Sequence, residues 1–130
     1  MILLDTHIVL WLAFEPDNLS RDAQSAIQQE RDAGGGLRIS SVTLLELAIL
    51  ATKGRYQHTM PIELFLEEVE TTFHVLPITA RGCARVLQLP ADYPRDPADR
   101  IIGATALVLG MQLVTADAAT RKSKAVPTIW

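Results

Sequence analysis

Five short apolar segments recur along the chain, and each is separated from the next by a stretch long enough to hold at least one helix. Neighbouring parallel strands need crossover connections of about a dozen residues or more, which are usually helical. The pattern therefore predicts an α/β fold, a three-layer sandwich in which helices flank a central parallel sheet. We expect strands over residues 1–4, 37–40, 75–78, 113–115 and 128–130, and helices over residues 8–14, 21–33, 42–53, 61–73, 80–89, 96–109 and 118–121.

The composition is that of an ordinary globular domain. Hydrophobic residues make up 48% of the chain and charged residues 21%, which excludes intrinsic disorder and fibrous repeats. The sequence holds no internal repeat, low-complexity tract or linker. We therefore expect a single domain over residues 1–130.

Cysteine use and hydropathy predict a cytoplasmic protein that does not associate with membranes. Cys83 is the only cysteine, so one chain cannot build a disulfide framework. The uncharged apolar stretch over residues 101–115 is too short to span a bilayer. The first residues lack the basic region that opens a signal peptide.

Charge is distributed unevenly along the chain. The formal net charge is −3, with eleven acidic and five basic residues in positions 1–75 but four acidic and seven basic residues in positions 76–130. Phosphate contacts need local lysines and arginines, which the second part supplies. Bulk charge therefore neither identifies nor excludes a nucleic-acid partner.

Two acids follow expected strands directly. Asp5 ends the first strand, and Asp117 comes two residues after Thr115, the last residue of another. Ligands of open α/β sheets bind beyond the carboxyl ends of the strands, so both acids are candidate site residues. The alternative is that each acid only caps the helix that follows it.

Glu46 lies in a helix that is apolar nearly all round, and we expect this helix to be buried. A buried, ionised carboxylate costs several kcal/mol unless it is paired or bound to a cation. A cation site explains Glu46 best, and a buried salt bridge to an arginine is the alternative.

Asp96 and Asp99 open the helix over residues 96–109, with Pro97 at its first position. Capping fully accounts for Asp96. Asp99 shares a helix face with Gly103 and Ala106, and these small residues should let the helix approach the sheet closely. This approach would bring Asp99 to the strand ends.

Carboxylates that converge on one edge of a sheet cannot all stay ionised without a counter-charge. Oxygen ligands without a histidine or cysteine cluster favour Mg²⁺ or Mn²⁺ over Zn²⁺. The sequence therefore predicts a divalent cation site formed by Asp5, Glu46, Asp99 and Asp117.

The acids lie within four sequence blocks that span nearly the whole chain. The blocks are Leu3-Leu4-Asp5-Thr6-His7, Ser41-Val42-Thr43-Leu44-Leu45-Glu46-Leu47, Asp96-Pro97-Ala98-Asp99-Arg100-Ile101-Ile102-Gly103-Ala104-Thr105-Ala106, and Leu113-Val114-Thr115-Ala116-Asp117. In content and order they resemble the PIN-domain family, and within it the VapC-type toxins of bacterial toxin–antitoxin pairs.

This resemblance implies a PIN-like, Rossmann-like fold and a Mg²⁺- or Mn²⁺-dependent endoribonuclease. It implies that Asp5, Glu46, Asp99 and Asp117 are the catalytic and metal-binding acids. Thr6, Thr115, Asp96 and Arg100 would be accessory: the two hydroxyls near the metal site, Asp96 as a cap, and Arg100 as a phosphate contact or as a surface side chain. The resemblance also implies an RNA substrate, a small cognate antitoxin and a homodimer.

Three other interpretations remain at this point. A PIN nuclease can serve RNA processing or act on DNA without being a toxin. A receiver-like signalling domain also binds Mg²⁺ through acids, but it needs an aspartate at the end of a central strand and a lysine at the end of a late one. Here residues 37–40 end in Ser40, and the late strand is followed by Ala116 and Asp117. A degenerate domain that acts only through its partner is disfavoured by the complete set of acids.

Overall fold

The predicted parallel sheet is present. In the computed structural model, which describes residues 1–54 and 60–130, five parallel strands form one sheet in the order β3-β2-β1-β4-β5. The strands are β1 (Ile2–Leu4), β2 (Arg38–Ser40), β3 (His74–Leu76), β4 (Gln112–Val114) and β5 (Thr128–Ile129). This topology confirms the predicted fold class.

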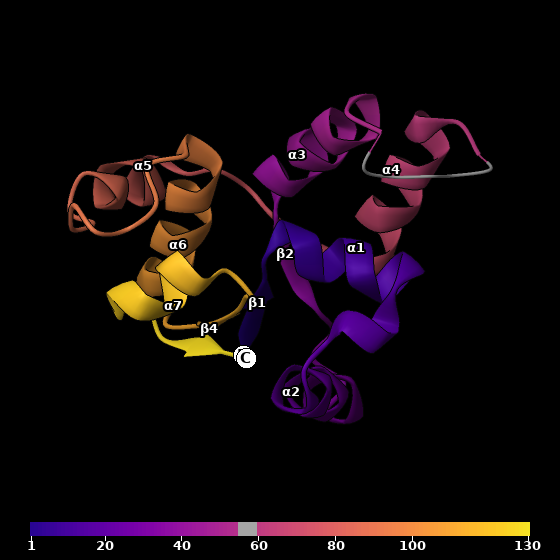
Figure 1. Cartoon of the computed structure of the whole chain (residues 1–130), viewed down its shortest axis with the longest axis horizontal. Coiled ribbons are helices and arrows are strands. Elements are labelled where there is room, and N and C mark those ends of the chain that lie inside the picture. The colour runs from indigo at the N-terminus through magenta and orange to yellow at the C-terminus, as the bar shows by residue number, and fades with distance from the viewer. Residues whose placement is uncertain (55–59) are drawn as a thin grey trace.

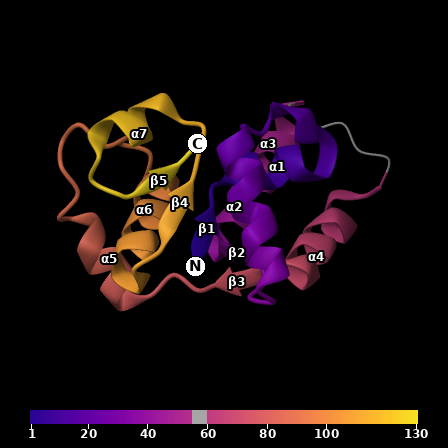
Figure 2. The ribbon, with the colours of Figure 1, turned by 90° about the horizontal axis from the view of Figure 1, so that it is seen from below.

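Helices cover both faces of the sheet. They are α1 (Thr6–Phe14), α2 (Arg21–Asp32), α3 (Ser41–Thr52), α4 (Ile62–Thr72), α5 (Ala80–Val86), α6 (Pro97–Leu109) and α7 (Ala118–Ser123), with a short 3₁₀ turn at Pro16–Asn18. Figures 1 and 2 both show α5, α6 and α7 on one side of the strands and α1 to α4 on the other. Among these described helices, none is both long and apolar enough to cross a membrane.

The core consists of two apolar clusters, one on each face of the sheet. Alternate residues of a strand point to opposite faces, and the two clusters follow that alternation. Leu4 and Val114 pack with the helices that precede β3, whereas Leu3 and Leu113 pack with α6. All four side chains are at most 1% exposed. These positions of β1 and β4 are therefore apolar on both faces of the sheet, because both faces are covered.

The chain leaves β1 in one direction to build β2 and β3, and then returns to build β4 and β5 on the other side of β1. The connections on the two sides of the boundary between β1 and β4 therefore lead in opposite directions. Such a switch point opens a crevice at the carboxyl ends of the strands. Asp5 and Thr115 follow these two strands directly.

The prediction that the helix carrying Glu46 is buried all round is wrong. Only Thr43 and Leu47 of α3 are buried, while Leu45 is 60% exposed and Ile49 is 43% exposed. The helix packs against α1, α4 and α6, and Leu45 and Ile49 face solvent. Its partly buried apolar side chains pack against the core clusters: Val42, Leu44, Leu50 and Ala51. The apolar sequence of α3 therefore does not mean that the whole helix is buried.

Smaller expectations also need correction. The helix expected to reach residue 89 ends at Val86 and continues only as turns. The space beside Gly103 is filled by the phenol of Tyr93, whereas Ala106 does pack with Leu3 and Leu113 in the core below α6. The expected close approach of α6 to the sheet is therefore seen at Ala106, whereas the small size of Gly103 makes room for Tyr93.

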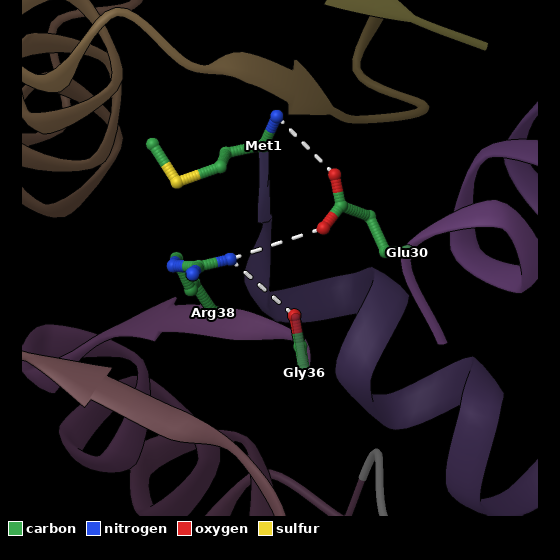
Figure 3. A network of polar contacts seen from close by, with 4 residues as sticks. All are labelled: Met1, Glu30, Gly36 and Arg38. Carbon is green, nitrogen blue, oxygen red and sulfur yellow. Dashed lines mark hydrogen bonds and ion pairs between the residues drawn. The ribbon is translucent and has the colours of Figure 1, made fainter. Parts of the chain in front are cut away.

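A polar network fastens the opposite end of the sheet. Glu30 of α2 lies between the terminal ammonium of Met1, at 3.2 Å, and the Arg38 guanidinium, at 3.9 Å (Figure 3). The guanidinium also donates to the Gly36 carbonyl. Because Met1 and Arg38 lie at the amino ends of β1 and β2, this network is remote from the strand ends that carry the predicted site.

Candidate active site

Asp5 links the neighbouring strands β1 and β4 at their carboxyl ends. Its Oδ1 accepts a hydrogen bond of 2.8 Å from the Thr6 backbone N–H and thereby caps α1. Its Oδ2 accepts a hydrogen bond of 2.7 Å from the hydroxyl of Thr115, the residue after β4. Both carboxylate oxygens of Asp5 therefore have fixed positions at the switch point.

Glu46 is bound to the same end of the sheet through threonine hydroxyls. The Thr6 hydroxyl donates to Glu46 Oε1 at 2.5 Å, and the Thr43 hydroxyl lies 3.1 Å from that of Thr6. Because Thr6 donates its one proton to Glu46, Thr43 is the donor to Thr6. Neither of the ion pairs in the described ranges involves Glu46, so the alternative of a buried salt bridge has no support there.

Asp96 and Asp99 reach the site from the start of α6. Asp96 Oδ1 accepts from the backbone N–H groups of Ala98, at 2.8 Å, and Asp99, at 3.3 Å, as predicted for a cap. One carboxylate oxygen each of Glu46, Asp96 and Asp99 lies within 4.8 Å of the others. Within residues 1–54 and 60–130, the Asp99 carboxylate accepts no hydrogen bond.

Asp117 caps α7 from beside Thr115. Its Oδ2 accepts from the backbone N–H of Thr120 at 2.8 Å and from the hydroxyl of the same residue at 2.7 Å. Its own backbone N–H donates to the Thr115 hydroxyl at 3.1 Å. Thr115 thus contacts both Asp5 and Asp117. In the geometry of the described residues, however, the tightest acidic group consists of Glu46, Asp99 and Asp96, not of the four predicted acids.

The charges of Asp5 and Asp117 also act on the group formed by Glu46, Asp96 and Asp99. Burial, followed by repulsion from Asp5, Asp96, Glu46 and Asp117, raises the pKa of Asp99 to about 7. Burial likewise raises the pKa of Asp5 despite the opposing hydrogen bond from Thr115.

The pKa of Glu46 is also raised, mainly by burial and further by Asp5 and Asp96, although its hydrogen bond from Thr6 opposes the rise. The carboxylates therefore destabilise one another's charged forms.

The site has the character of a receptor for a hard cation. It presents carboxylate and hydroxyl oxygens, and no lysine or arginine of the described part forms an ion pair with its acids. A divalent cation binds such oxygens and removes the cost of gathering the charges. The donor set therefore fits Mg²⁺ or Mn²⁺.

Arg100, an accessory candidate, is turned away from the acids. Its guanidinium donates to the backbone carbonyls of Pro94, Tyr93 and Pro90 at 2.9, 3.1 and 3.3 Å. These bonds engage its Nε and Nη2 groups with the loop before α6.

Thr43 and Tyr93 also lie at the site, and neither was predicted from the sequence. Thr43 lies three residues before Glu46 on the same face of α3, and this spacing indicates that both side chains meet the same part of the site, where Thr43 contacts Thr6. Tyr93 lies in a proline-flanked segment and gave no comparable signal. Burial and the nearby Asp5, Asp99 and Asp117 raise its pKa well above the usual value, so the phenol stays protonated.

The fold and the site together define a parallel α/β domain with an acidic, cation-receptive centre at the carboxyl ends of its strands. The family model described as "PIN domain" matches residues 2–124 of the chain. The chain belongs to the PIN domain family, whose nucleases use divalent metals. This membership excludes the receiver-like alternative.

Two kinds of relatives support this placement. The chain is 35% identical over 123 residues to Ribonuclease VapC22 of Mycobacterium tuberculosis, an alignment that covers 95% of this chain and 92% of that protein. Among solved structures, it resembles VapBC2 from Rickettsia felis bound to a DNA fragment from their promoter. That similarity has a TM-score of 0.71 at 15% identity and covers 98% of this chain and 97% of the other.

A toxin–antitoxin complex from Klebsiella pneumoniae is also similar in fold. Its TM-score is 0.67 at 24% identity, with 100% of this chain and 97% of that chain covered. At these identities the structural similarity establishes the shared fold, and it confirms the PIN-like architecture predicted from the sequence.

Proposed function

We propose that the chain is a metal-dependent endoribonuclease, the toxin of a VapBC-type toxin–antitoxin pair, that hydrolyses RNA phosphodiester bonds at its acidic centre. The observation that carries the proposal is Asp99: a partly buried carboxyl with a pKa raised to about 7, gathered with Glu46 and Asp96 and paired with no described cation. The 35% identity to a ribonuclease over nearly the full length of both chains supports the choice of reaction.

Asp5, Glu46, Asp99 and Asp117 hold the ion in this proposal, with Asp96 at its edge. Mg²⁺ and Mn²⁺ both suit these oxygen donors. When bound, the ion supplies positive charge that activates water and neutralises the phosphoryl oxygens in an in-line displacement.

The residues of the chain orient these acids. Thr115 holds one oxygen of Asp5, and Thr6 holds one oxygen of Glu46. Fixed carboxylates need little rearrangement when the ion and the phosphodiester arrive, which favours the transition state. The chain thus contributes an oriented set of oxygens.

RNA phosphates can be met by basic residues next to the acids. Arg121 and Lys122 lie in α7, the helix capped by Asp117, and Lys124 follows that helix. Arg95 directly precedes Asp96 and is exposed. We assign phosphate contacts to these four residues in preference to Arg100, whose Nε and Nη2 groups already bind backbone carbonyls.

Two protein partners belong to the proposal. Several similar structures are of VapBC or toxin–antitoxin complexes, which supports a small cognate antitoxin for this chain. Leu45 and Ile49, one turn apart on α3, are 60% and 43% exposed. Exposed apolar side chains on one helix face favour contact with another chain, and we assign them to a homodimer.

The deciding experiment is cleavage of total cellular RNA by the purified, antitoxin-free protein. We expect discrete fragments with Mg²⁺ or Mn²⁺, and no cleavage in EDTA or with Asp99→Asn or Asp5→Asn. Glu67→Gln, an exposed acid of α4, is the control that should retain full activity. Cleavage of DNA but not RNA would support the alternative PIN nuclease, and full activity of both aspartate variants would refute the proposed site.

A further inference from the structure

Tyr93 is almost completely buried although it lies outside the helices and strands. Its side chain is 1% exposed, and it belongs to the segment between α5 and α6. Its hydroxyl lies 3.4 Å from the backbone carbonyl oxygen of Asp99 and donates to it. Connecting segments usually run over the surface, so a buried phenol aimed at the first turn of α6 calls for an explanation.

Gly103 provides the space in which the phenol sits. A Cβ at this position would lie 2.2 Å from the Tyr93 hydroxyl oxygen and 2.7 Å from the ring carbon that bears it. Both distances are far below van der Waals contact, so any side chain here would displace the phenol. Gly103 lies one turn after Asp99 on α6, and the ring therefore packs directly against the part of the helix that presents this acid.

Arg100 holds the segment that carries Tyr93. Its guanidinium reaches back from α6 to the carbonyl oxygens of Pro90, Tyr93 and Pro94, at distances of 2.9–3.3 Å. Charge-assisted hydrogen bonds from a rigid guanidinium are among the stronger bonds in proteins. The segment is thus fastened to α6 at both ends of its turn, with the phenol enclosed between them.

The same segment also contacts α7, the helix capped by Asp117. The Thr120 side chain lies near enough to the phenol to affect its pKa, and Thr120 supplies both hydrogen bonds to Asp117 Oδ2 through its backbone N–H and its hydroxyl. Near the surface, the Ser123 hydroxyl donates to Asp92 Oδ1 at 3.1 Å. Tyr93 therefore lies between the backbone of one site acid and the residue that orients another.

We propose that Tyr93 is a positioning residue that fixes Asp99 and Asp117 relative to each other, with Gly103 as its seat and Arg100 as its clamp. The inference rests on the proposed metal site and adds to it a part that touches neither metal nor substrate. Residues that orient metal ligands in this way typically change metal affinity or activity by 10–100-fold when altered.

The test is to measure Mn²⁺ binding by the full chain with electron paramagnetic resonance, at a temperature well below the unfolding midpoint. Tyr93→Phe removes one oxygen atom and should raise the Kd for Mn²⁺ roughly tenfold. Arg100→Lys keeps the charge but loses the forked contacts, and should raise the Kd in the same direction. The matched control is Thr105→Val, which removes another buried hydroxyl of α6, one that donates to the Ile101 carbonyl.

The control separates positioning from general stability. In EDTA, the thermal unfolding midpoints of Tyr93→Phe and Thr105→Val should fall by similar amounts. Only Tyr93→Phe should lose Mn²⁺ affinity. Equal losses of affinity in the two variants, or unchanged affinity in Tyr93→Phe, overturn the inference. If Tyr93→Phe binds normally while Asp99→Asn loses the ion, only the role of Tyr93 fails; normal binding by both variants also refutes the proposed metal site.

Discussion

Replacing Asp99 by asparagine is expected to stabilise the metal-free protein at pH 8 while removing the stabilisation that Mg²⁺ gives. The pKa of this carboxyl is about 7 in the folded protein instead of its usual 3.8. The folded state therefore binds the proton more tightly than the unfolded state does, so the free energy of unfolding falls between pH 3.8 and 7 and stays lowered above pH 7.

The size of this effect follows from the two pKa values. At 1.36 kcal/mol per pKa unit the complete difference corresponds to about 4 kcal/mol. Asp99 is only partly buried, and solvent screening reduces this to about 1–2 kcal/mol. Asparagine carries no charge, so the variant escapes the penalty. For a chain of this size we expect its unfolding midpoint to rise by about 3–8 °C at pH 8.

Urea and thermal unfolding in EDTA, at pH 4 and at pH 8, measure the effect. The advantage of Asp99→Asn should be present at pH 8 and nearly absent at pH 4, where the wild-type carboxyl is protonated. Excess Mg²⁺ should reverse the order at pH 8, because a ligand at about 100 times its Kd adds about 2.7 kcal/mol to the wild type alone. Glu67→Gln removes the same charge from α4 and should show neither behaviour. An equal gain at both pH values, or none at pH 8, would refute the electrostatic argument.

Three further outcomes are expected. Thr115→Val removes the hydroxyl that contacts Asp5 and Asp117, and should lower both Mn²⁺ affinity and RNA cleavage by about 10–100-fold in binding and rate assays. Gly103→Ala should lower the free energy of unfolding in urea by about 1–3 kcal/mol, because its methyl group displaces the Tyr93 phenol. Chelation by EDTA should abolish cleavage, and titration with Mg²⁺ or Mn²⁺ should restore it; activity that persists in EDTA would refute metal dependence.

The order of elements could be predicted because β1 and most of β4 are buried on both faces. Leu3, Leu4, Leu113 and Val114 form uninterrupted apolar pairs that only a covered parallel sheet accommodates. Boundaries of helices were harder to predict, since the helix expected over residues 80–89 loses its regular hydrogen bonds after Val86 without a glycine or proline at that point. Hydropathy also overestimated the burial of α3, because exposed apolar side chains such as Leu45 and Ile49 give the same sequence pattern as buried ones.

The role of Tyr93 could not be predicted because it depends on tertiary placement. Nothing in the local sequence indicates that its phenol replaces a side chain at Gly103, ten residues later. Glycine within a helix usually costs about 1 kcal/mol, which signals a packing reason without identifying the partner. The four aspartates were easier to place for the opposite reason, since each one follows a strand or lies at the start of a helix, so the topology predicts its place at the edge of the sheet. Glu46 lies in the middle of α3 and was proposed from the apolar residues around it.

From the sequence, capping and metal binding were alternatives for Asp5 and Asp117, and capping was assigned to Asp96; in the structure, capping is compatible with the proposed metal binding. Each of the three is the N-cap of a helix, and in Asp96 and Asp117 a single oxygen makes all the capping bonds. A carboxylate has two oxygens, so capping with one leaves the other for a cation and also fixes its direction. The positive ends of the helix dipoles partly offset the gathered charge. Asp99 caps no helix, so both of its carboxylate oxygens are left for the proposed ion, and burial and the neighbouring acids raise its pKa to about 7. Helix starts at the strand ends therefore do more than connect elements, because they supply the orientation that the proposed metal site requires.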